Sequence, residues 1–327
     1  MKNKAFFLGL LIMGILFFSA SSCSKDDEPG VPVVSTAEAT KISQTTAASG
    51  GNITDDGGAI ITAQGVAWST SQSPTIDDSR TEDGNDGGSF ASSISGLEPN
   101  TTYYVRAYAT NSVGTGYGDA ISFATLEEVV DADGNFYSTV IIGNQEWFAE
   151  NLRTTVYNDG TPIPNIRGDL NWINLTTGAY AWYNNNEASY KETYGALYNW
   201  HAVEPGNLCP AGWHVPSDED WRSLTDYVGG RSLAGGKLKS TRTAPDAHPR
   251  WQSPNTGATD EYGFSALPGG IRGENFNFIG IYGFWWSSTE NSPEEAWRRF
   301  IDFDFVFVSR SHDFKHHGYS VRCVRDN

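Results

Sequence analysis

Apolar and polar residues alternate along much of the chain, which is the pattern of half-buried β-strands. Between residues 33 and 125, short runs of β-branched and aromatic residues are separated by turns rich in Gly, Asp and Asn. Within the segment 103–109, Tyr103, Val105 and Ala107 fall on one face of an expected strand. About seven such strands in roughly 95 residues favour a β-sandwich.

One segment in the second half of the chain has the pattern of a short amphipathic helix. Ser217, with Asp220 three residues later, has the spacing of a capping box. The residues that then share one helical face are Trp221, Leu224 and Val228. Gly229-Gly230 ends the helix. Since this is one of very few helical signals, the predicted fold class is a mainly β N-terminal sandwich followed by an α+β domain with few helices and long loops.

Two acidic stretches are compatible with either a turn or a Ca²⁺ loop. Residues 131–135 have the acidic spacing that begins an EF-hand loop, but Ile142 stands where the bidentate Glu belongs. We therefore expect a tight hairpin turn with Asp133-Gly134 at its tip, followed by a strand from Phe136 to Ile142. The second stretch, residues 77–86, is interpreted as a solvated loop rather than a Ca²⁺ site.

The N-terminus has the pattern of an export signal. Lys2 and Lys4 precede an apolar run over residues 5–18, which is short for a membrane span and typical of a signal peptide. Small residues follow, and then Cys23. This order resembles a bacterial lipoprotein signal, although Ala20 stands where Leu is usual. The resemblance implies cleavage before Cys23 and lipidation of that residue; ordinary secretion is the alternative.

The residues after Cys23 indicate a destination. The stretch Ser24-Lys25-Asp26-Asp27-Glu28 resembles the signal that sends Bacteroidota lipoproteins to the outer face of the outer membrane, and it is also an acidic linker. We expect an outer-membrane protein that is anchored by its N-terminal lipid and faces the cell exterior. The expected parts are a signal peptide (1–22), an acidic linker (23–32), a β-sandwich (33–126) and a C-terminal domain (129–327).

Net charge and cysteine count limit the classes of partner that the chain can bind and the roles that its cysteines can have. Asp and Glu number 39 against 22 Lys and Arg, a net charge of −17, which argues against a nucleic-acid partner. If Cys23 carries lipid, Cys209 and Cys323 remain, and in an exported chain such a pair favours one disulfide. That bond would close a loop of about 115 residues. Two buried thiols or a metal pair are the alternatives, although structural zinc takes four ligands.

The first half of the chain also resembles a known repeat. Residues 97–103 contain the Leu-x-Pro-x-Thr-x-Tyr run that leads into the penultimate strand of fibronectin type III and related Ig-like domains, where the Tyr fixes a corner. Trp68 stands where these domains bury a core Trp. The resemblance covers residues 33–125 and implies a spacer domain.

Ordered motifs across the second half resemble one family closely. They extend over residues 129–327: Asp131–Tyr137, Ile142–Leu152, Tyr194–Trp200, Cys209–Trp221, Tyr262–Gly270, Trp286–Glu290 and Tyr319–Val324. Together they are similar to the Fibrobacter succinogenes major paralogous domain. This resemblance implies the C-type-lectin-like fold of formylglycine-generating enzymes and of retroelement-diversified receptor proteins.

The candidate chemistry does not favour an enzyme. The cysteine pair of formylglycine-generating enzymes is not carried over, because Cys209 and Cys323 lie in motifs of structural character. Ca²⁺-dependent lectins use a Glu-Pro-Asn loop, and the nearest match, Glu204-Pro205-Gly206, lacks the Asn. We expect no enzyme activity, no cofactor and no metal. One further cluster is interpreted as an exposed polar turn rather than a transition-metal site: His312, His316 and His317, near Asp313.

Three functions of different classes remain. The first is a surface protein in which a lipid anchor and a β-sandwich spacer carry a lectin-like head that binds a glycan or protein ligand, for adhesion or recognition. The second is a structural envelope protein, and the third is a protein- or glycan-modifying enzyme. An exposed aromatic patch would favour the first, buried aromatic residues the second, and convergent ionisable groups in a pocket the third. We expect the first.

The segment from Phe284 to Gly318 is the expected binding face. From Arg298 it starts as a strand, and both faces of that strand carry large apolar side chains, more than one core requires. The segment resembles the variable region of retroelement-diversified receptors; a buried final hairpin is the alternative. We assign Trp286 and Trp297 to the core. The expected ligand contacts are aromatic or imidazole groups with polar partners: Trp285, Phe303, Phe305, Phe307, His312 and Phe314, with Asp302, Asp304 and Arg310.

Overall fold

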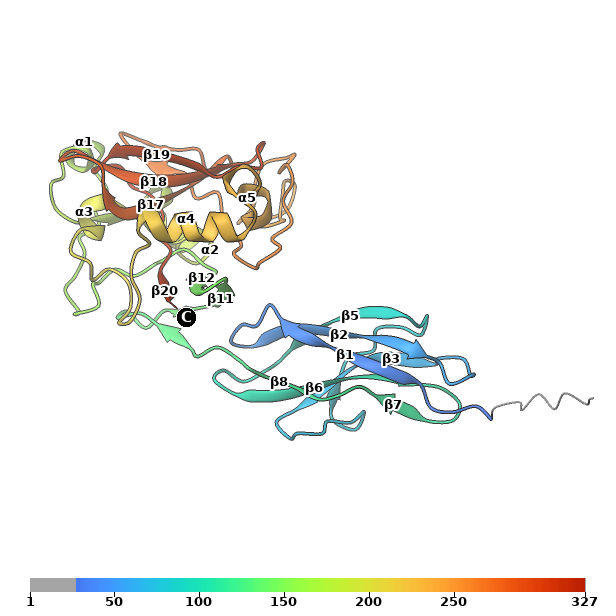
Figure 1. Cartoon of the computed structure of the whole chain (residues 1–327). Coiled ribbons are helices and arrows are strands. Elements are labelled where there is room, and N and C mark those ends of the chain that lie inside the picture. The colour runs from blue at the N-terminus through green and yellow to red at the C-terminus, as the bar shows by residue number, and fades with distance from the viewer. Residues whose placement is uncertain (1–27, 327) are drawn as a thin grey trace, which may run out of the picture.

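The structure is a computed structural model that describes residues 28–326. Strands and long loops dominate it, helices are few, and the chain forms two successive bodies (Figure 1). The expectation of a β-rich chain with few helices is confirmed. The signal peptide and Cys23 lie outside the described residues. Within residues 28–326, no helix has both the length and the apolar character that a membrane span needs.

The N-terminal body is built from two antiparallel sheets. One has the strand order β1-β2-β5, and the other the order β4-β3-β6-β7 with β8 paired to β6. The bounds are β1 Val33–Thr40, β2 Thr46–Asp55, β3 Ala63–Ser69, β4 Ser79–Arg80, β5 Ser89–Ser95, β6 Thr102–Thr110, β7 Thr115–Tyr117 and β8 Ile121–Ala124. Side chains of both sheets share one buried cluster, in which Ala47 and Ile94 of the first sheet lie with Val66 and Val105 of the second.

Strand β6 shows how far the alternating pattern holds. Tyr103 and Val105 are buried as expected, and the hydroxyl of Tyr103 accepts a hydrogen bond from the backbone N–H of Glu98 at 3.0 Å. Tyr108 departs from the alternation, because it is also buried and its hydroxyl donates to the carbonyl of Thr81 at 2.7 Å. A buried tyrosine is tolerated where its O–H finds such a partner.

The C-terminal body combines short sheets, short helices and long loops. Its strands are β9 Val129–Val130, β10 Phe136–Tyr137, β11 Thr139–Ile142, β12 Gln145–Phe148, β13 Tyr180–Ala181, β14 Leu197–Tyr198, β15 Ile271–Arg272, β16 Phe276–Asn277, β17 Tyr282–Glu290, β18 Glu295–Asp302, β19 Ser309–Phe314 and β20 Val324–Asp326. Its helices are α1 Asp169–Ile173, η1 Tyr183–Asn185, α2 Glu187–Tyr194, α3 Trp200–Val203, α4 Asp218–Tyr227 and α5 Arg231–Leu238. The β17-β18-β19 sheet forms one layer, with α4 and α5 beside it (Figure 1). In the β11-β12-β20 sheet the beginning of this body pairs with its end.

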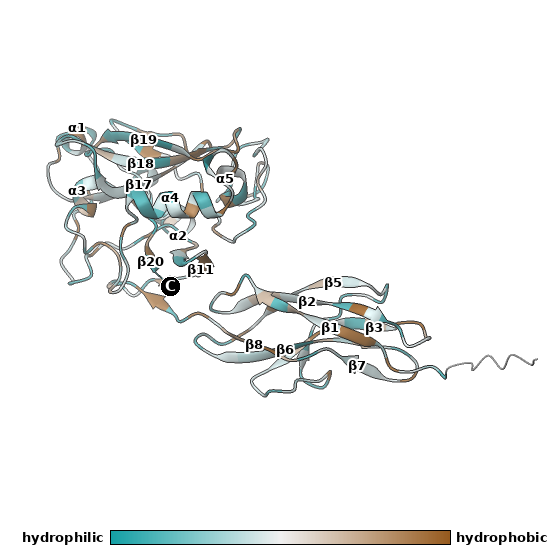
Figure 2. Ribbon diagram, viewed as in Figure 1, coloured by the Kyte–Doolittle hydropathy of each residue, from teal (hydrophilic) through white to brown (hydrophobic). Residues whose placement is uncertain are grey.

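Helix α4 begins as the capping box predicts. The Ser217 side chain accepts the backbone N–H of Asp220, and the Asp220 carboxylate accepts the backbone N–H of Ser217 at 2.8 Å. Trp221, Leu224 and Val228 are buried, whereas the charged residues between them, Arg222 and Asp226, are exposed. Figure 2 shows hydrophobic and hydrophilic residues alternating along the helix. The sequence therefore predicted both the start and the buried face of this helix correctly.

The predicted turn that begins at Asp131 also forms. Strands β9 and β10 pair around it, and the Asp131 carboxylate accepts the backbone N–H groups of Asp133 and Asn135, both at 2.9 Å. The hydroxyl of Tyr137 donates to the same carboxylate at 2.6 Å. The strand expected after the turn is divided at Ser138, because β10 pairs with β9 whereas β11 pairs with β12.

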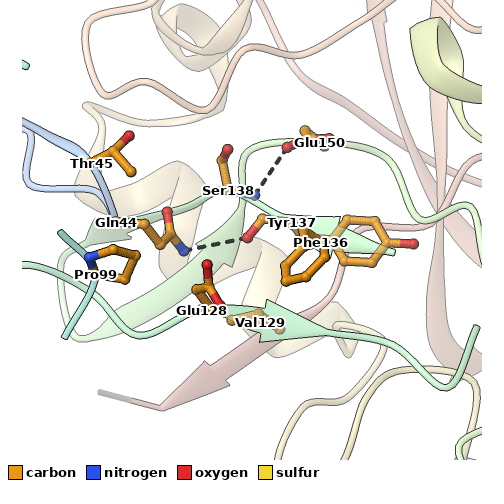
Figure 3. A pocket seen from close by; sticks show the side chains of 9 residues that line it. All are labelled: Gln44, Thr45, Pro99, Glu128, Val129, Phe136, Tyr137, Ser138 and Glu150. Carbon is orange, nitrogen blue, oxygen red and sulfur yellow. Dashed lines mark hydrogen bonds between the residues drawn. The ribbon is translucent and has the colours of Figure 1, made fainter. Parts of the chain in front are cut away.

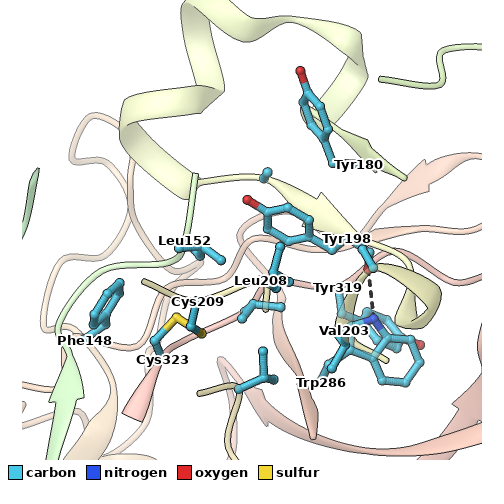
Figure 4. Close-up of a cluster of buried hydrophobic side chains, with 14 of the residues drawn as sticks. Phe148, Leu152, Tyr180, Tyr198, Val203, Leu208, Cys209, Trp286, Tyr319 and Cys323 are labelled. Carbon is cyan, nitrogen blue, oxygen red and sulfur yellow. Dashed lines mark hydrogen bonds between the residues drawn. A yellow bond between two sulfur atoms is a disulfide. The ribbon is translucent and has the colours of Figure 1, made fainter. Parts of the chain in front are cut away.

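Cys209 and Cys323 form the expected disulfide (Figure 4). Both are buried inside an aromatic cluster that also contains Phe148, Tyr198 and Trp286. The indole Nε1 of Trp286 donates to the carbonyl of Tyr198 at 2.8 Å, the interaction drawn in Figure 4. The disulfide therefore joins the loop before α4 to the last segment of the chain inside the core.

Strands β17 and β18 have a core on each face. On one face, Phe284 and Trp286 pack in the cluster that contains the disulfide. On the other face, Trp285 and Ile301 pack with Trp221 of α4. The adjacent tryptophans of β17 are both fully buried, because successive side chains of a strand point to opposite faces.

Replacing Cys209 and Cys323 together by Ser should destabilise the protein by about 4–5 kcal/mol, because the bond closes a long loop with a sequence separation of 114 residues. Urea unfolding followed by Trp fluorescence measures the change. Cys23→Ser is the control, since residue 23 lies outside the closed loop. An unchanged unfolding midpoint in the double variant would contradict the prediction.

Candidate binding face on the β18–β19 hairpin

The expected ligand contacts lie on β17, β18 and β19 and on the loop between the last two strands. Residues 303–308, which we call the phenylalanine loop, leave the sheet at this point. The alternating pattern predicts a strand through them, but β18 ends at Asp302. The Asp302 carboxylate accepts the backbone N–H of Asp304 at 2.7 Å, a local bond that competes with strand pairing.

Three of the expected contacts belong to the interior. The assignment of Trp285 to the binding face is wrong: the residue is fully buried, and its Nε1 donates to Oδ1 of Asn151 at 2.9 Å. Asp302 is buried and its carboxylate is engaged by the loop backbone, so it is not an available polar partner. Phe303 is half-buried and packs against the cluster beneath α4.

Phe305 and Phe307 form an exposed aromatic pair on the phenylalanine loop. They are 49% and 38% exposed, and their ring centroids lie 5.1 Å apart. Asp304, which precedes them, is exposed and accepts the hydroxyl of Thr256 at 3.2 Å. Covering adjacent apolar rings with a partner removes them from water and lowers the free energy of the complex. This pair is therefore the best candidate contact surface on the hairpin.

A second surface group surrounds Trp297 of β18. The guanidinium of Arg310 lies 3.3 Å from the centre of the Trp297 ring, and the His312 ring meets that ring edge-on at 5.4 Å. Nδ1 of His312 lies 2.9 Å from the carboxylate of Glu295. Trp297, which we assigned to the core, is only half-buried: its partner in register is His312, and the Arg310 guanidinium lies over its ring.

Two arginines connect this surface to the start of α4. Arg299 and Arg310 both donate to the carboxylate of Asp218, at 2.8 and 2.9 Å. Burial opposes ionisation of Asp218, but the hydrogen bonds from the two arginines lower its pKa below the ordinary value. Arg310 is therefore an exposed residue whose position is fixed by an ion pair and by the Trp297 ring.

Phe314 lines a hollow at the other end of β19. The residue is 49% exposed and stacks on His316, with ring centroids 5.5 Å apart and ring planes 9° apart. The hollow has a volume of about 410 Å³, and Asn174, His201 and Glu294 also line it. The expected contacts thus fall into separate groups along one hairpin rather than on a single continuous face.

The histidine cluster is divided among different partners. Asp313 accepts the hydroxyl of Tyr319 at 2.6 Å and Nε of Arg298 at 3.1 Å, and Nδ1 of His317 lies 2.8 Å away. Burial opposes ionisation, but the hydrogen bonds from His317 and Tyr319 hold the pKa of Asp313 well below its ordinary value. In the part of the chain that the structure describes, no group of three or more His, Cys, Asp or Glu side chains is placed to hold a metal ion.

A polar contact between the two bodies was not predicted. Gln44 is buried, donates from Nε2 to Oγ1 of Thr139 at 2.8 Å, and accepts the Thr139 backbone N–H at 3.1 Å. Nε2 also lies 3.4 Å from the carbonyl of Tyr137, the contact drawn in Figure 3. A hollow of about 250 Å³ adjoins it, lined in part by Phe136 and Glu150. In the sequence, Gln44 has the pattern of an ordinary turn residue, so no signal identified this contact.

Buried and exposed aromatic residues of this region should respond differently to truncation. Trp285→Ala should destabilise the C-terminal body by about 3–5 kcal/mol, because the fully buried ring leaves a cavity. Phe305→Ala and Phe307→Ala should each change the free energy of unfolding by less than about 1 kcal/mol. Denaturant unfolding measured by circular dichroism separates the cases. Equal destabilisation by all three changes would show that the Phe rings belong to the core.

Comparison with known proteins identifies the C-terminal body. No curated protein matches the sequence. Two matching solved structures are both of the sensor domain of the anti-sigma factor RsgI4 in Pseudobacteroides cellulosolvens; each is 17% identical, covers 30% of this chain and has a TM-score of 0.23, and the matches cover 97% and 76% of those chains. The model of the Fibrobacter succinogenes major domain matches residues 140–325, more than half of the chain. The protein therefore belongs to the Fibrobacter succinogenes major domain family, as the order of its motifs predicted.

Proposed function

We propose that the protein is an exported surface lipoprotein whose family domain binds an extracellular glycan or protein. The N-terminal lysines, the apolar run and Cys23 support lipid anchoring at the outer membrane, with the acidic residues after Cys23 as the signal for the outer face. In this proposal the lipid is the contact with the membrane, and nucleic acid is not a partner, because the chain carries a net charge of −17.

The N-terminal body serves in this proposal as a spacer of fibronectin type III or Ig-like fold. Two facing sheets and the hydrogen bond from the Glu98 backbone to the hydroxyl of Tyr103 support that assignment. The family domain is the head, for which we propose a C-type-lectin-like fold. Its few helices, its long loops and the pairing of β12 with β20 support this.

The observation that carries the proposal is the exposed pair of Phe305 and Phe307 on the phenylalanine loop. The domain has two buried aromatic cores, so these rings are not needed to fill either of them. Aromatic side chains supply a large contact area at low cost in conformational entropy, and they stack on sugars or fill pockets of a protein partner. An exposed pair of adjacent rings therefore favours recognition over a purely structural role.

An enzyme is not our proposal, because the ionisable groups around Trp297 are engaged in pairs. Arg310 binds Asp218, and His312 lies against Glu295. A catalytic site needs an acid, a base or a nucleophile that is free to contact the substrate at hydrogen-bond distance. These contacts instead fix the surface around Trp297, which suits a binding role.

Ligand binding by the whole chain should depend on the phenylalanine loop. A glycan array and a protein array identify a ligand, and the double variant Phe305→Ala, Phe307→Ala should weaken its binding about 5- to 150-fold, or about 1–3 kcal/mol. Phe278→Ala is the matched control, because Phe278 is 47% exposed but lies outside the hairpin. Unchanged binding by the double variant would place the ligand elsewhere.

Cys23→Ser should release the protein from membranes, since the expected lipid would have no attachment point. Fractionation of cells into membrane and soluble material, followed by immunoblotting, measures the distribution. Ser24→Ala keeps the cysteine and is the control. A Cys23→Ser variant that stays with the outer membrane would contradict the lipid anchor while leaving the binding proposal standing.

A further inference from the structure

Lys239 is a buried cation beneath the phenylalanine loop. It follows the last residue of α5, its exposure is 0%, and its ammonium lies 5.6 Å from the centre of the Trp251 ring. A buried charge is costly unless hydrogen-bonding partners replace the water that it loses. Here the partners are backbone carbonyls rather than a carboxylate.

Four carbonyl oxygens converge on Nζ of Lys239. Three belong to the hairpin: those of Asp302 at 3.1 Å, Phe303 at 3.3 Å and Phe305 at 3.0 Å. The fourth is that of Thr256, at 2.8 Å. Converging carbonyls present their negative ends to one point, which is also how backbone oxygens replace the water shell of a potassium ion. Without a cation, the carbonyl of Asp302 would be buried and would lose this partner, whereas that of Phe303 would keep the backbone N–H of Thr256 at 2.8 Å.

The inner edge of the loop is otherwise fixed by small residues and backbone bonds. The carbonyl of Val306 accepts the N–H of Gly236 at 3.0 Å, and the N–H of Val308 donates to the carbonyl of Arg231 at 2.8 Å. A Cβ at Gly235 would lie 2.5 Å from the carbonyl oxygen of Phe307, so only glycine lets the loop approach α5 this closely. The carbonyls face inward, and the two Phe rings remain at the surface.

Burial lowers the pKa of Lys239 to about 8, and the nearby carboxylates of Asp302 and Asp304 oppose that shift. The amine is therefore mostly protonated at neutral pH. All four of its hydrogen bonds go to the converging carbonyls, and three of these tie the loop end of the hairpin to the residue that follows α5.

We infer that the four carbonyls form a site for a small ammonium ion, that Lys239 occupies this site as a tethered cation, and that this occupancy sets the shape of the phenylalanine loop. Lys239 is then a positioning residue for Phe305 and Phe307. Its effect on loop conformation stands by itself; its effect on ligand binding rests on the proposed function.

The test is hydrogen–deuterium exchange of the whole chain at pH 7. In Lys239→Ala, the amides of Gly236, Thr256 and Val308, which bond across the loop, should exchange at least about tenfold faster, because a buried charged donor is lost. Methylammonium added to this variant should restore slow exchange. Tetramethylammonium, which has the same charge but no N–H donor, should not.

Two further variants separate charge from packing. Lys239→Met keeps the length of the side chain without its charge, so it should exchange as fast as Lys239→Ala and should not respond to methylammonium, because the space is filled. Lys237→Ala, on the same helix, removes a partly exposed lysine that pairs with Glu261 and should leave exchange in the loop unchanged.

Three results would overturn the inference. Slow exchange in Lys239→Met would show that the stem of the side chain, not its charge, holds the loop. Fast exchange throughout the C-terminal body, including the Phe148 amide that bonds to Cys323, would make Lys239 a general core residue. Equal effects of methylammonium and tetramethylammonium would exclude a site for N–H donors. None of these readouts depends on a ligand, so the binding proposal can fail separately.

Discussion

The buried guanidinium of Arg322 holds together the segments on which the family domain depends. It donates to the carbonyls of Phe148, Phe264 and Ser265 and to Oδ1 of Asn151, and it lies 4.3 Å from the centre of the Phe264 ring. These partners come from distant parts of the sequence. A buried charge that loses its partners is strongly destabilising. Residues 148–151, residues 264–265 and the segment around Arg322 are therefore held in a single arrangement. Asn151 also accepts the Trp285 indole N–H, which extends this constraint to the central sheet.

The sequence predicted the features that rest on local rules or on ordered motifs. The capping box fixed the start of α4, the Asp131 carboxylate fixed a turn, and Cys209 and Cys323 formed the disulfide that we expected. Trp285 was placed wrongly because alternation implies one buried and one exposed face, whereas β17 is covered on both faces. When each face of a strand has its own core, the two-residue alternation of the sequence cannot tell which of two neighbours, such as Trp285 and Trp286, is buried.

The phenylalanine loop was missed as a loop for a related reason. Its residues have the composition of a strand, but the ammonium that its carbonyls bind comes from Lys239, far away in the sequence. A lone lysine after a helix gives no signal that its ammonium will be buried. The exposed pair itself was predicted, because the segment with Phe305 and Phe307 has more large apolar side chains than one core can bury. The carbonyl site that positions the pair depends on tertiary contacts alone.

The disulfide gives the proposed surface protein a mechanical property. A domain that is anchored on its N-terminal side and loaded at a bound ligand is under tension, and tension extends whichever part of the chain can lengthen. Without the bond, the stretch of chain from Cys209 to Cys323, a separation of 114 residues, would span roughly 400 Å when fully extended. The proposed contact residue Phe305 lies inside this loop. While the bond is intact, a pull on Phe305 therefore reaches Cys209 through Cys323, and only the 18 residues from Phe305 to Cys323 can be drawn out rather than the long stretch that follows Cys209. Reduction of the bond would convert a short, stiff connection into a long compliant one.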